Sequence, residues 1–311
     1  MDKVLVVGSL NMDCVINLPR RPKPGETVFG SSFKLVPGGK GANQAYALGR
    51  MGVDTSMIGA IGKDDFGRKL LQNLQSAGVN TDGVVPCENL GTGKAFIAVE
   101  DNGQNSIIVL AEANAAVDIA MLDKHPELLA TAEAVVMQLE VPMPVIMAAA
   151  HRVREHGGLV ILDPAPARAD IPDELLAAVD IIKPNETELA KLTGMPTTTR
   201  EEMVQAARSL LNRGAKAVLL SLGGDGSAFI DAGQADFFPA EKVKAVDTTA
   251  AGDCFTAAFV ARLQRQPGCM PTRENVQEAI RFATVAASIA VTRPGAQTSI
   301  PSLAEVEARL H

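Results

Sequence analysis

The sequence predicts a layered α/β fold built on a mainly parallel sheet. Short apolar runs rich in Val, Ile and Leu recur along the 311 residues, without the period-two alternation of a half-exposed strand. Longer stretches with helical spacing separate these runs, so strands and helices alternate as they do in folds with right-handed crossovers. Polar or glycine-rich segments follow one strand after another, which predicts a ligand site at the carboxyl edge of the sheet.

Six apolar runs are expected to form the core strands: Val4–Val7, Met57–Ile61, Ala134–Met137, Leu159–Leu162, Val179–Ile182 and Ala217–Leu220. The stretches between and after them combine Ala, Leu, Glu, Arg and Lys at helical spacing. They are expected to form five helices: Asn43–Met51, Arg68–Ala77, Val145–Glu155, Glu201–Asn212 and Cys254–Leu263.

Two segments interrupt this alternation. Asp13–Val36 carries three prolines, and Gly91–Leu110 holds two strand-like runs, Ala95–Glu100 and Ser106–Leu110. We expect both to be hairpin-like insertions, at about residues 13–36 and 91–112, that pair into a small β lid over one edge of the core. No low-complexity linker or internal repeat appears, so a single domain over residues 1–311 is expected.

Composition narrows the class of protein. The net charge of −7 does not suit a nucleic-acid binder, which needs a basic face. No uncharged apolar stretch approaches about 18 residues and no signal-peptide pattern opens the chain, so a cytoplasmic protein with no membrane contact is expected. Its four cysteines are far apart and are expected to be reduced thiols. Its four histidines form no metal-ligand cluster, which leaves acid–base chemistry to a carboxylate.

A first glycine-rich segment, residues 37–44, reads PGGKGANQ and leads into an expected helix. Glycines allow backbone N–H groups to approach a ligand closely, and a helix start favours negative or polar groups. The segment matches neither G-x-x-x-x-G-K-[ST] nor G-x-G-x-x-G. Taken alone, it is equally compatible with a tight turn before a helix.

A second segment, residues 247–253, reads DTTAAGD and precedes the apolar helix Cys254–Leu263. Small residues at a helix start leave N–H groups free to face an anion. Asp253 at this position is either a helix-capping carboxylate or a base beside the anion hole. The second interpretation supplies what phosphoryl transfer to an alcohol needs, which is charge stabilisation and a base near the attacking hydroxyl.

Together these segments resemble the two signature motifs of the ribokinase-like (PfkB) carbohydrate kinases, G-G-x-G-x-N and D-T-x-x-A-G-D. The resemblance extends along nearly the whole chain, through N-x-D after the first strand, Q-L-E, P-N-E-x-E and T-R-x-G-A-Q. It implies a layered α/β/α core with a small β lid. It also implies transfer of the γ-phosphate of ATP to a primary hydroxyl of a furanose, with ribose as the first expectation, and dependence on Mg²⁺ and a monovalent cation, K⁺.

The resemblance also implies residue roles. Asp253 corresponds to the base that takes the hydroxyl proton, and Ala250, Ala251 and Gly252 to the anion hole around the γ-phosphate. The residues that match the sugar site are Asn11, Asp13, Gly39, Lys40, Asn43, Glu140 and Asp253. For Glu140, a helix-start glutamate is an equally good interpretation from the sequence alone.

The nucleotide and cation sites follow from the same comparison of motifs. Asn185 and Glu188 match an N-x-x-E motif at the Mg²⁺ and phosphate end of ATP, where hard oxygen ligands are suitable. The remaining matches to the nucleotide site are Ser221, Gly223, Gly224, Asp225, Gly226, Gly252 and Thr284. The matches to the monovalent-cation site are Asp247, Thr249, Ala290, Arg293, Gly295 and Ser299.

Two charged residues depart from the family pattern. Lys94 lies where a small or apolar residue facing the sugar is expected, and Glu112 replaces a position that is often glycine. Either they face solvent, or they admit another substrate such as deoxyribose, fructose or a nucleoside. A non-catalytic sugar-binding protein is the more distant alternative. Lid strands with unpaired edges need cover, which together with the resemblance favours a homodimer that joins two lids.

Overall fold

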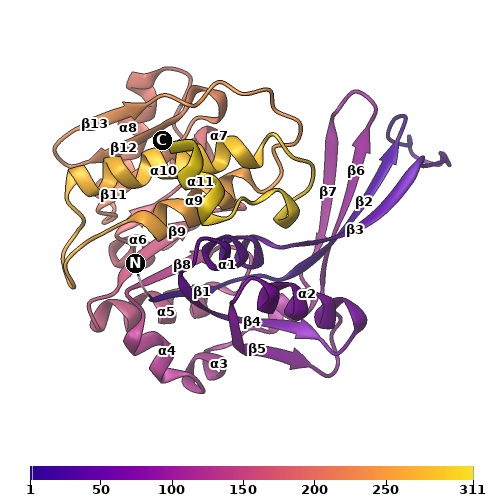
Figure 1. Cartoon of the computed structure of the whole chain (residues 1–311), viewed down its shortest axis with the longest axis horizontal. Coiled ribbons are helices and arrows are strands. Elements are labelled where there is room, and N and C mark those ends of the chain that lie inside the picture. The colour runs from indigo at the N-terminus through magenta and orange to yellow at the C-terminus, as the bar shows by residue number, and fades with distance from the viewer. Residues whose placement is uncertain (2, 311) are drawn as a thin grey trace.

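The computed structural model of the chain describes residue 1 and residues 3–310 (Figure 1). A nine-stranded sheet runs in the order β13-β12-β11-β10-β9-β8-β1-β4-β5, and it is parallel from β11 to β5. The bounds of its parallel strands are β1 (Lys3–Val7), β4 (Asp54–Gly62), β5 (Asn80–Cys87), β8 (Ala134–Gln138), β9 (Leu159–Asp163), β10 (Ile181–Ile182) and β11 (Ala217–Ser221). The antiparallel edge consists of β12 (Ser227–Asp231) and β13 (Ala235–Phe238).

Helices cover both faces of this sheet. One face carries α1 (Lys40–Arg50), α2 (Asp65–Ser76), α9 (Ala251–Arg262), α10 (Arg273–Ala290) and α11 (Leu303–Leu310) (Figure 1). The other carries α3 (Ile119–Asp123), α4 (Pro126–Thr131), α5 (Met143–Glu155), α6 (Asp173–Ala178), α7 (Glu186–Thr193) and α8 (Arg200–Asn212). Successive residues of β1 enter opposite layers, Val4 and Val6 one and Leu5 and Val7 the other. The predicted α/β/α layering is confirmed.

A second, four-stranded sheet projects from one side of the molecule, at the right of Figure 1. Its order is β3-β2-β6-β7, with β2 (Asn11–Leu18), β3 (Ser32–Gly38), β6 (Gly93–Glu100) and β7 (Asn105–Leu110). Each insertion forms an antiparallel pair, and β2 joins β6 in parallel register, so that Asn11 lies opposite Gly93 and Asp13 opposite Ala95. The two insertions therefore pair into the small sheet that the sequence predicts.

Several elements differ from the sequence-based expectation. The strand expected at Val179–Ile182 is reduced to Ile181–Ile182, because the Val179 N–H bonds to Leu176 O and ends α6. Helix α1 begins at Lys40 and α9 at Ala251, so both glycine-rich segments are themselves helix starts. The sequence analysis did not identify β5, β12, β13 or the long α10.

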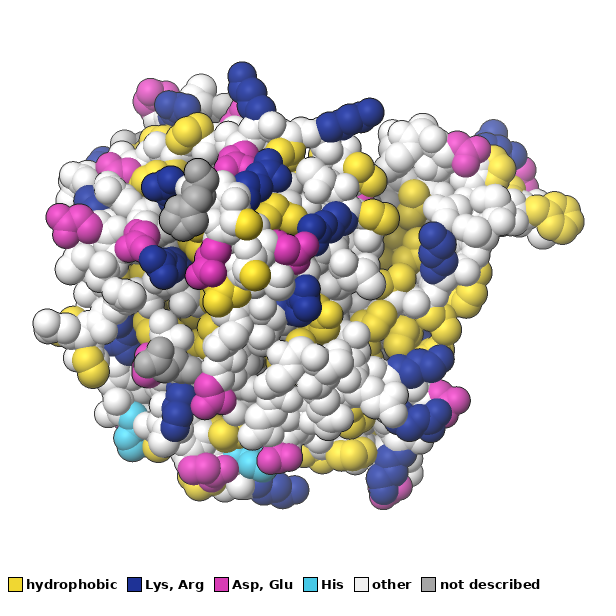
Figure 2. Space-filling view, viewed as in Figure 1, with side chains coloured by type: hydrophobic (Ala, Val, Ile, Leu, Met, Phe, Trp, Pro, Cys, Tyr) yellow, Lys and Arg dark blue, Asp and Glu magenta, His cyan; other side chains and the backbone are white. Residues whose placement is uncertain are grey.

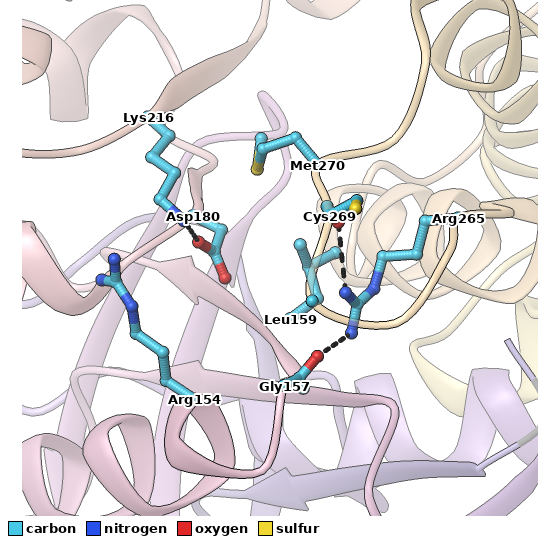
Figure 3. Close-up of a pocket in the computed structure, with 10 residues that line it drawn as sticks. Arg154, Gly157, Leu159, Asp180, Lys216, Arg265, Cys269 and Met270 are labelled. Atoms are coloured by element: carbon cyan, nitrogen blue, oxygen red, sulfur yellow. Dashed lines mark hydrogen bonds and ion pairs between the residues drawn. The ribbon is translucent and has the colours of Figure 1, made fainter.

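The amino edge of the sheet is closed by internal contacts. A cavity of about 230 Å³ lies there (Figure 3), and its charged side chains face protein groups. Lys216 Nζ lies 2.6 Å from Asp180 Oδ1, and Arg265 donates to the carbonyls of Gly157 and Cys269 at 2.6 and 3.1 Å. These contacts are internal to the protein, so we assign this cluster a structural role. No helix in the described part of the chain is long and apolar enough to cross a membrane.

Candidate active site

The start of α9 forms a tight turn at the carboxyl edge of the main sheet, which is the candidate anion-binding turn. Ala250 precedes the helix with φ 58°, a left-handed conformation that costs a non-glycine residue about 1–2 kcal/mol. Asp247 holds the turn by accepting hydrogen bonds from the N–H groups of Thr249 and Gly295, at 2.9 and 2.8 Å. Among the described residues, the N–H groups of Gly252 and Asp253 have no acceptor. The turn therefore presents free donors to an incoming anion.

Asp253 is buried directly behind these donors. Its two carboxylate oxygens accept hydrogen bonds from Asn43 Nδ2 at 2.8 Å and from Gln44 Nε2 at 3.0 Å, both on α1. Burial raises the pKa of Asp253, the charge of Lys40 opposes that rise, and Asp163 adds to it. A carboxylate with a raised pKa is a better proton acceptor than a solvent-exposed one, which suits a general base.

Polar side chains from the small sheet and the core surround this carboxylate. Asn11 is buried, and its Oδ1 accepts from Asn114 Nδ2 at 2.8 Å. Glu140 accepts hydrogen bonds from Ser9 Oγ and, at 3.2 Å, from the Lys40 N–H. Burial raises the pKa of Glu140. Burial, followed by the charges of Glu140 and Asp253, raises the pKa of Asp13 to about 7. Three mutually repelling carboxylates thus converge on one place.

The sharp turn between β3 and α1 requires glycine. Gly39 has φ 89°, and a Cβ there would lie 2.6 Å from Asn11 N and 3.0 Å from Leu10 Cα. A Cβ on Gly38 would lie 2.2 Å from Asp13 Oδ2. This close approach lets α1 bring Lys40, Asn43 and Gln44 against the strands that carry Asn11 and Asp13.

A cavity of about 680 Å³ opens from Asp253 along the carboxyl edge, within the size range of cofactor sites. Of the residues matched to the nucleotide site, all except Asp225 line it: Asn185, Glu188, Ser221, Gly223, Gly224, Gly226, Gly252 and Thr284. Asp225 lies in the same turn, with its N–H bonded to Leu222 O. Ala250 and Ala251 also line the cavity. Apolar residues that the sequence analysis did not assign to the site, such as Val243, Phe255 and Val291, line another part of it.

Lys40 contributes more than the backbone donor that its motif predicts. Its side chain lines the cavity, near four carboxylates. Burial alone would lower the pKa of Lys40, but the charges of Asp163, Asp253, Glu140 and Glu188 together raise it. A cation held among these groups can bridge the sugar side of the site and the phosphate side.

Four further polar residues were not assigned a role from the sequence. Gln44 and Asn114 hold Asp253 and Asn11, as described above, while Asp163 and Lys183 are buried in the wall of the cavity. Asp163 and Lys183 each directly follow a strand that the sequence predicts. This position could have identified them as candidate site residues.

The residues matched to Mg²⁺ and K⁺ lie at two different places. Asn185 and Glu188 form the capping box of α7 and line the cavity, where carboxylate and amide oxygens suit a metal that arrives with phosphates. Asp247, Thr249 and Gly295 are joined by the hydrogen bonds of the α9 turn, and Ala290 O accepts from the Arg293 N–H at 3.1 Å. Ser299 is buried and donates to Ala296 O at 2.7 Å. This second group lies beside the cavity and does not line it.

Lys94 and Glu112 lie at the base of the small sheet and contact each other. Lys94 Nζ is 3.4 Å from Glu112 Oε1, and Glu112 Oε2 accepts from the Gly91 N–H at 3.3 Å. Lys94 is in register with Met12, one residue away from Asp13, so it belongs to the opposite face of the sheet from Asp13. The contact between Lys94 and Glu112 therefore joins the start of β6 to the segment that follows β7.

The pKa of Asp13 predicts a specific dependence of stability on pH. The unfolded chain loses this proton near pH 3.8 and the folded chain near 7, so the folded state binds more protons between these values. Stability should therefore fall as pH rises from about 4 to 7, by at most about 4 kcal/mol from this group. Asp13→Asn should be more stabilising, relative to wild type, at pH 8 than at pH 5. Thermal unfolding at both pH values checks this, with the surface change Asp82→Asn as control; equal shifts at both pH values would contradict it.

Comparisons with known proteins agree with this geometry. A family model described as pfkB family carbohydrate kinase matches residues 1–303. A ribokinase of Staphylococcus aureus (strain COL) is 40% identical over 306 residues, which cover 98% of each chain. A deoxyribokinase of Salmonella typhi is 36% identical over 302 residues, which cover 96% of each. The structure of Arabidopsis thaliana ribokinase complexed with ribose and ATP is similar with a TM-score of 0.91 and 37% identity, covering 99% of this chain and 98% of that one.

The α/β/α core, the small sheet and the candidate anion-binding turn at the start of α9 occur here in one chain, and the family match extends over nearly all of it. The chain therefore belongs to the pfkB family of carbohydrate kinases.

Proposed function

We propose that this protein is an ATP-dependent ribokinase that converts ribose to ribose 5-phosphate. The observation that carries the proposal is the position of Asp253, at one end of a nucleotide-sized cavity, behind the free N–H groups of α9 and beside the polar cluster of Asn11, Asp13 and Glu140. Several relatives are ribokinases, and one was solved with ribose and ATP. ATP is the phosphoryl donor of the cytoplasm, so a cytoplasmic reaction is part of the proposal.

The sugar is proposed to bind between the small sheet and the core. Asn11, Asp13 and Glu140 accept or donate hydrogen bonds to its hydroxyls, with the N–H of Gly39 and the amide of Asn43 beside them. Because Asn114 and Ser9 already hold two of these groups, the site is organised before the sugar arrives. Closure of the small sheet as a lid would keep water from the phosphoryl group.

In the proposed mechanism, Asp253 accepts the proton of the primary hydroxyl as its oxygen attacks the γ-phosphorus. The bond from that phosphorus to the β–γ bridging oxygen breaks, and ADP leaves with the electron pair. The N–H groups of Gly252 and Asp253 stabilise charge on the transferring group. Mg²⁺ held with the nucleotide near Asn185 and Glu188 would supply further charge neutralisation. K⁺ near Asp247, Thr249 and Ser299, with carbonyls of Ala290, Arg293 and Gly295, would stiffen the turn before α9.

The positions of Lys94 and Glu112, the two charged residues that depart from the family pattern, disfavour a sugar that already carries a phosphate. Lys94 and Glu112 neutralise each other, and Lys94 belongs to the face opposite Asp13, so neither adds a cation for a second phosphate. ADP release should be measured with Mg²⁺, ATP and K⁺ against ribose, 2-deoxyribose, arabinose, fructose, fructose phosphates and nucleosides. The strongest release is expected with ribose. Faster ADP release with deoxyribose would make deoxyribose the preferred substrate. No ADP release with any sugar would overturn the kinase proposal.

A homodimer joined through the small sheets is also proposed. Both faces of this sheet expose large apolar side chains, and Figure 2 shows hydrophobic side chains gathered along its flank. The exposed residues are Phe33, Leu35, Phe96, Ile107, Ile108, Val109 and Leu110. Exposed apolar side chains of this number usually mark an interface, and in a symmetric pair the small sheet of each chain would cover that of its partner.

Light scattering after size exclusion tests the dimer. The expected mass is twice the 32.6 kDa of one chain, and Ile108→Glu should shift it to the monomer because Ile108 is 66% exposed in the single chain. The matched control is Ile119→Glu, another exposed isoleucine outside this sheet. A monomeric wild type, or an unchanged mass for Ile108→Glu, would contradict the proposed interface.

A further inference from the structure

The side chain of Lys183 is buried in the wall of the nucleotide cavity with its hydrogen-bonding capacity unused. Only 5% of the side chain is exposed, yet its one ion-pair partner within 4.0 Å among the described residues is Asp163, at 4.0 Å. No hydrogen bond from its ammonium is found within residues 1 and 3–310. An ammonium has three donors, and burying it without acceptors is costly unless something else completes its surroundings.

The position of this ammonium is tied to the anion-binding turn. A Cβ built on Gly252 would lie 3.2 Å from Lys183 Nζ, so the cation borders the free N–H groups at the start of α9. Both residues line the cavity, together with Asp253. An anion seated on the α9 turn would therefore meet the charge of Lys183 as well as the backbone donors.

Asp163 connects this cation to the base. Its Oδ2 accepts from Gln44 Nε2 at 2.9 Å, and the same nitrogen donates to Asp253 Oδ1 at 3.0 Å. Gln44 is fixed in turn by Gln138 Nε2, which donates to its Oε1 at 2.6 Å. Asp163 Oδ1 is buried and has no partner among the described residues. One amide group thus sets the relative positions of the base and the carboxylate beside Lys183.

Lys40 differs from Lys183 in its surroundings. The charges of Asp163, Asp253, Glu140 and Glu188 raise the pKa of Lys40 against the effect of burial. The ion pair of Lys183 with Asp163 is beyond hydrogen-bond distance. Lys183 Nζ also borders Gly252, so its donors are placed for a phosphate oxygen at the α9 turn.

We propose that Lys183 is a catalytic residue that donates hydrogen bonds to the transferring phosphoryl group, and that Asp163 is a positioning residue which aims it. The inference rests on the proposed kinase activity. As the bond between the γ-phosphorus and the bridging oxygen breaks and the bond to the sugar oxygen forms, Lys183 keeps its proton and neutralises charge on the equatorial oxygens. The hydroxyl proton still goes to Asp253.

The first test is Lys183→Met, which keeps the length of the side chain and removes the charge. We expect kcat to fall about 100-fold with the KM for the sugar within about 3-fold, as for loss of one transition-state donor. The matched control, Lys191→Met, changes an exposed lysine of α7 and should leave both constants unchanged. A wild type without kinase activity would refute the proposed function itself, whereas a fully active Lys183→Met would refute only this inference.

A second variant separates catalysis from simple neutralisation of Asp163. If Lys183 merely balances that carboxylate, the double variant Asp163→Asn/Lys183→Met should recover wild-type kcat, and this result would overturn the proposal. We expect it to stay slow. Calorimetry gives a readout besides turnover: with ribose present, Lys183→Met should bind ADP with aluminium fluoride about 100-fold more weakly, while ADP alone binds within about 3-fold of wild type. Equal losses for both ligands would also contradict the proposal.

Discussion

Replacing Asp253 with alanine is expected to lower kcat about 1,000-fold while the affinity for ATP stays within a few-fold. The carboxylate is the only acidic group that both lies behind the α9 donors and contacts the sugar-side amides of α1 in the described residues. Its loss removes the proton acceptor but leaves the N–H groups and the nucleotide cavity in place. Steady-state kinetics and calorimetric titration with ATP measure the two effects separately.

Asp82→Ala is the matched control for this change. Asp82 is an exposed aspartate of β5 that does not line the cavity, so its removal should leave kcat near the wild-type value. Thermal unfolding confirms that both variants are folded. Near-normal turnover by Asp253→Ala would show that Asp253 is not the base, and the α9 turn would then act only as an anion site.

Substituting alanine for Gly39 should reduce kcat/KM for the sugar by about 100-fold or more. Its φ of 89° strains any other residue, and the added Cβ would lie 2.6 Å from Asn11 N, so backbone must move. The movement displaces the first turn of α1, which carries the amides that hold Asp253. A shift of about 1 Å at such groups is enough for an effect of this size.

Gly78 offers a control with the same backbone strain and no steric clash. Its φ is 82°, and a Cβ there would have nothing within 4 Å. Gly78→Ala should therefore lose a similar amount of stability from the left-handed conformation while keeping kcat/KM. If the two variants lost catalytic efficiency equally, strain rather than the close approach to Asn11 would be responsible.

The sequence predicted the core strands and the loops after them because buried parallel strands appear as uninterrupted apolar runs. The edge elements lack this signal: β5 includes Thr81, Asp82, Gly83 and Pro86, and β13 is half-buried along its whole length. Helix α10 could have been predicted from its N-terminal cap, because the side chain of Thr272 accepts a hydrogen bond from Asn275 N. Its packing against α9 places it in the layer that carries the anion-binding turn.

The residues of the candidate site were more predictable from the sequence than the hydrogen bonds that join them. Motif segments predicted Asp253, Glu140 and Asn185 as site residues, and each lies shortly after a strand or at a helix start. The bond between Gln44 and Asp163 joins residues 119 positions apart, and no local pattern indicates such a partner. In the sequence, Lys183 is indistinguishable from an exposed charged residue after a strand. Only the fold shows that it is buried beside Gly252.

The central claim, transfer of a phosphoryl group from ATP to the primary hydroxyl of ribose, is tested most directly by identifying the product. Ribose incubated with the protein, Mg²⁺, K⁺ and ATP should give one sugar phosphate, in which ¹H–³¹P correlation NMR couples the phosphorus to the two C5 protons. A sample of Asp253→Ala should contain almost none of it. Phosphorus coupled to the C1 proton, or ADP with inorganic phosphate and no sugar phosphate, would contradict the claim.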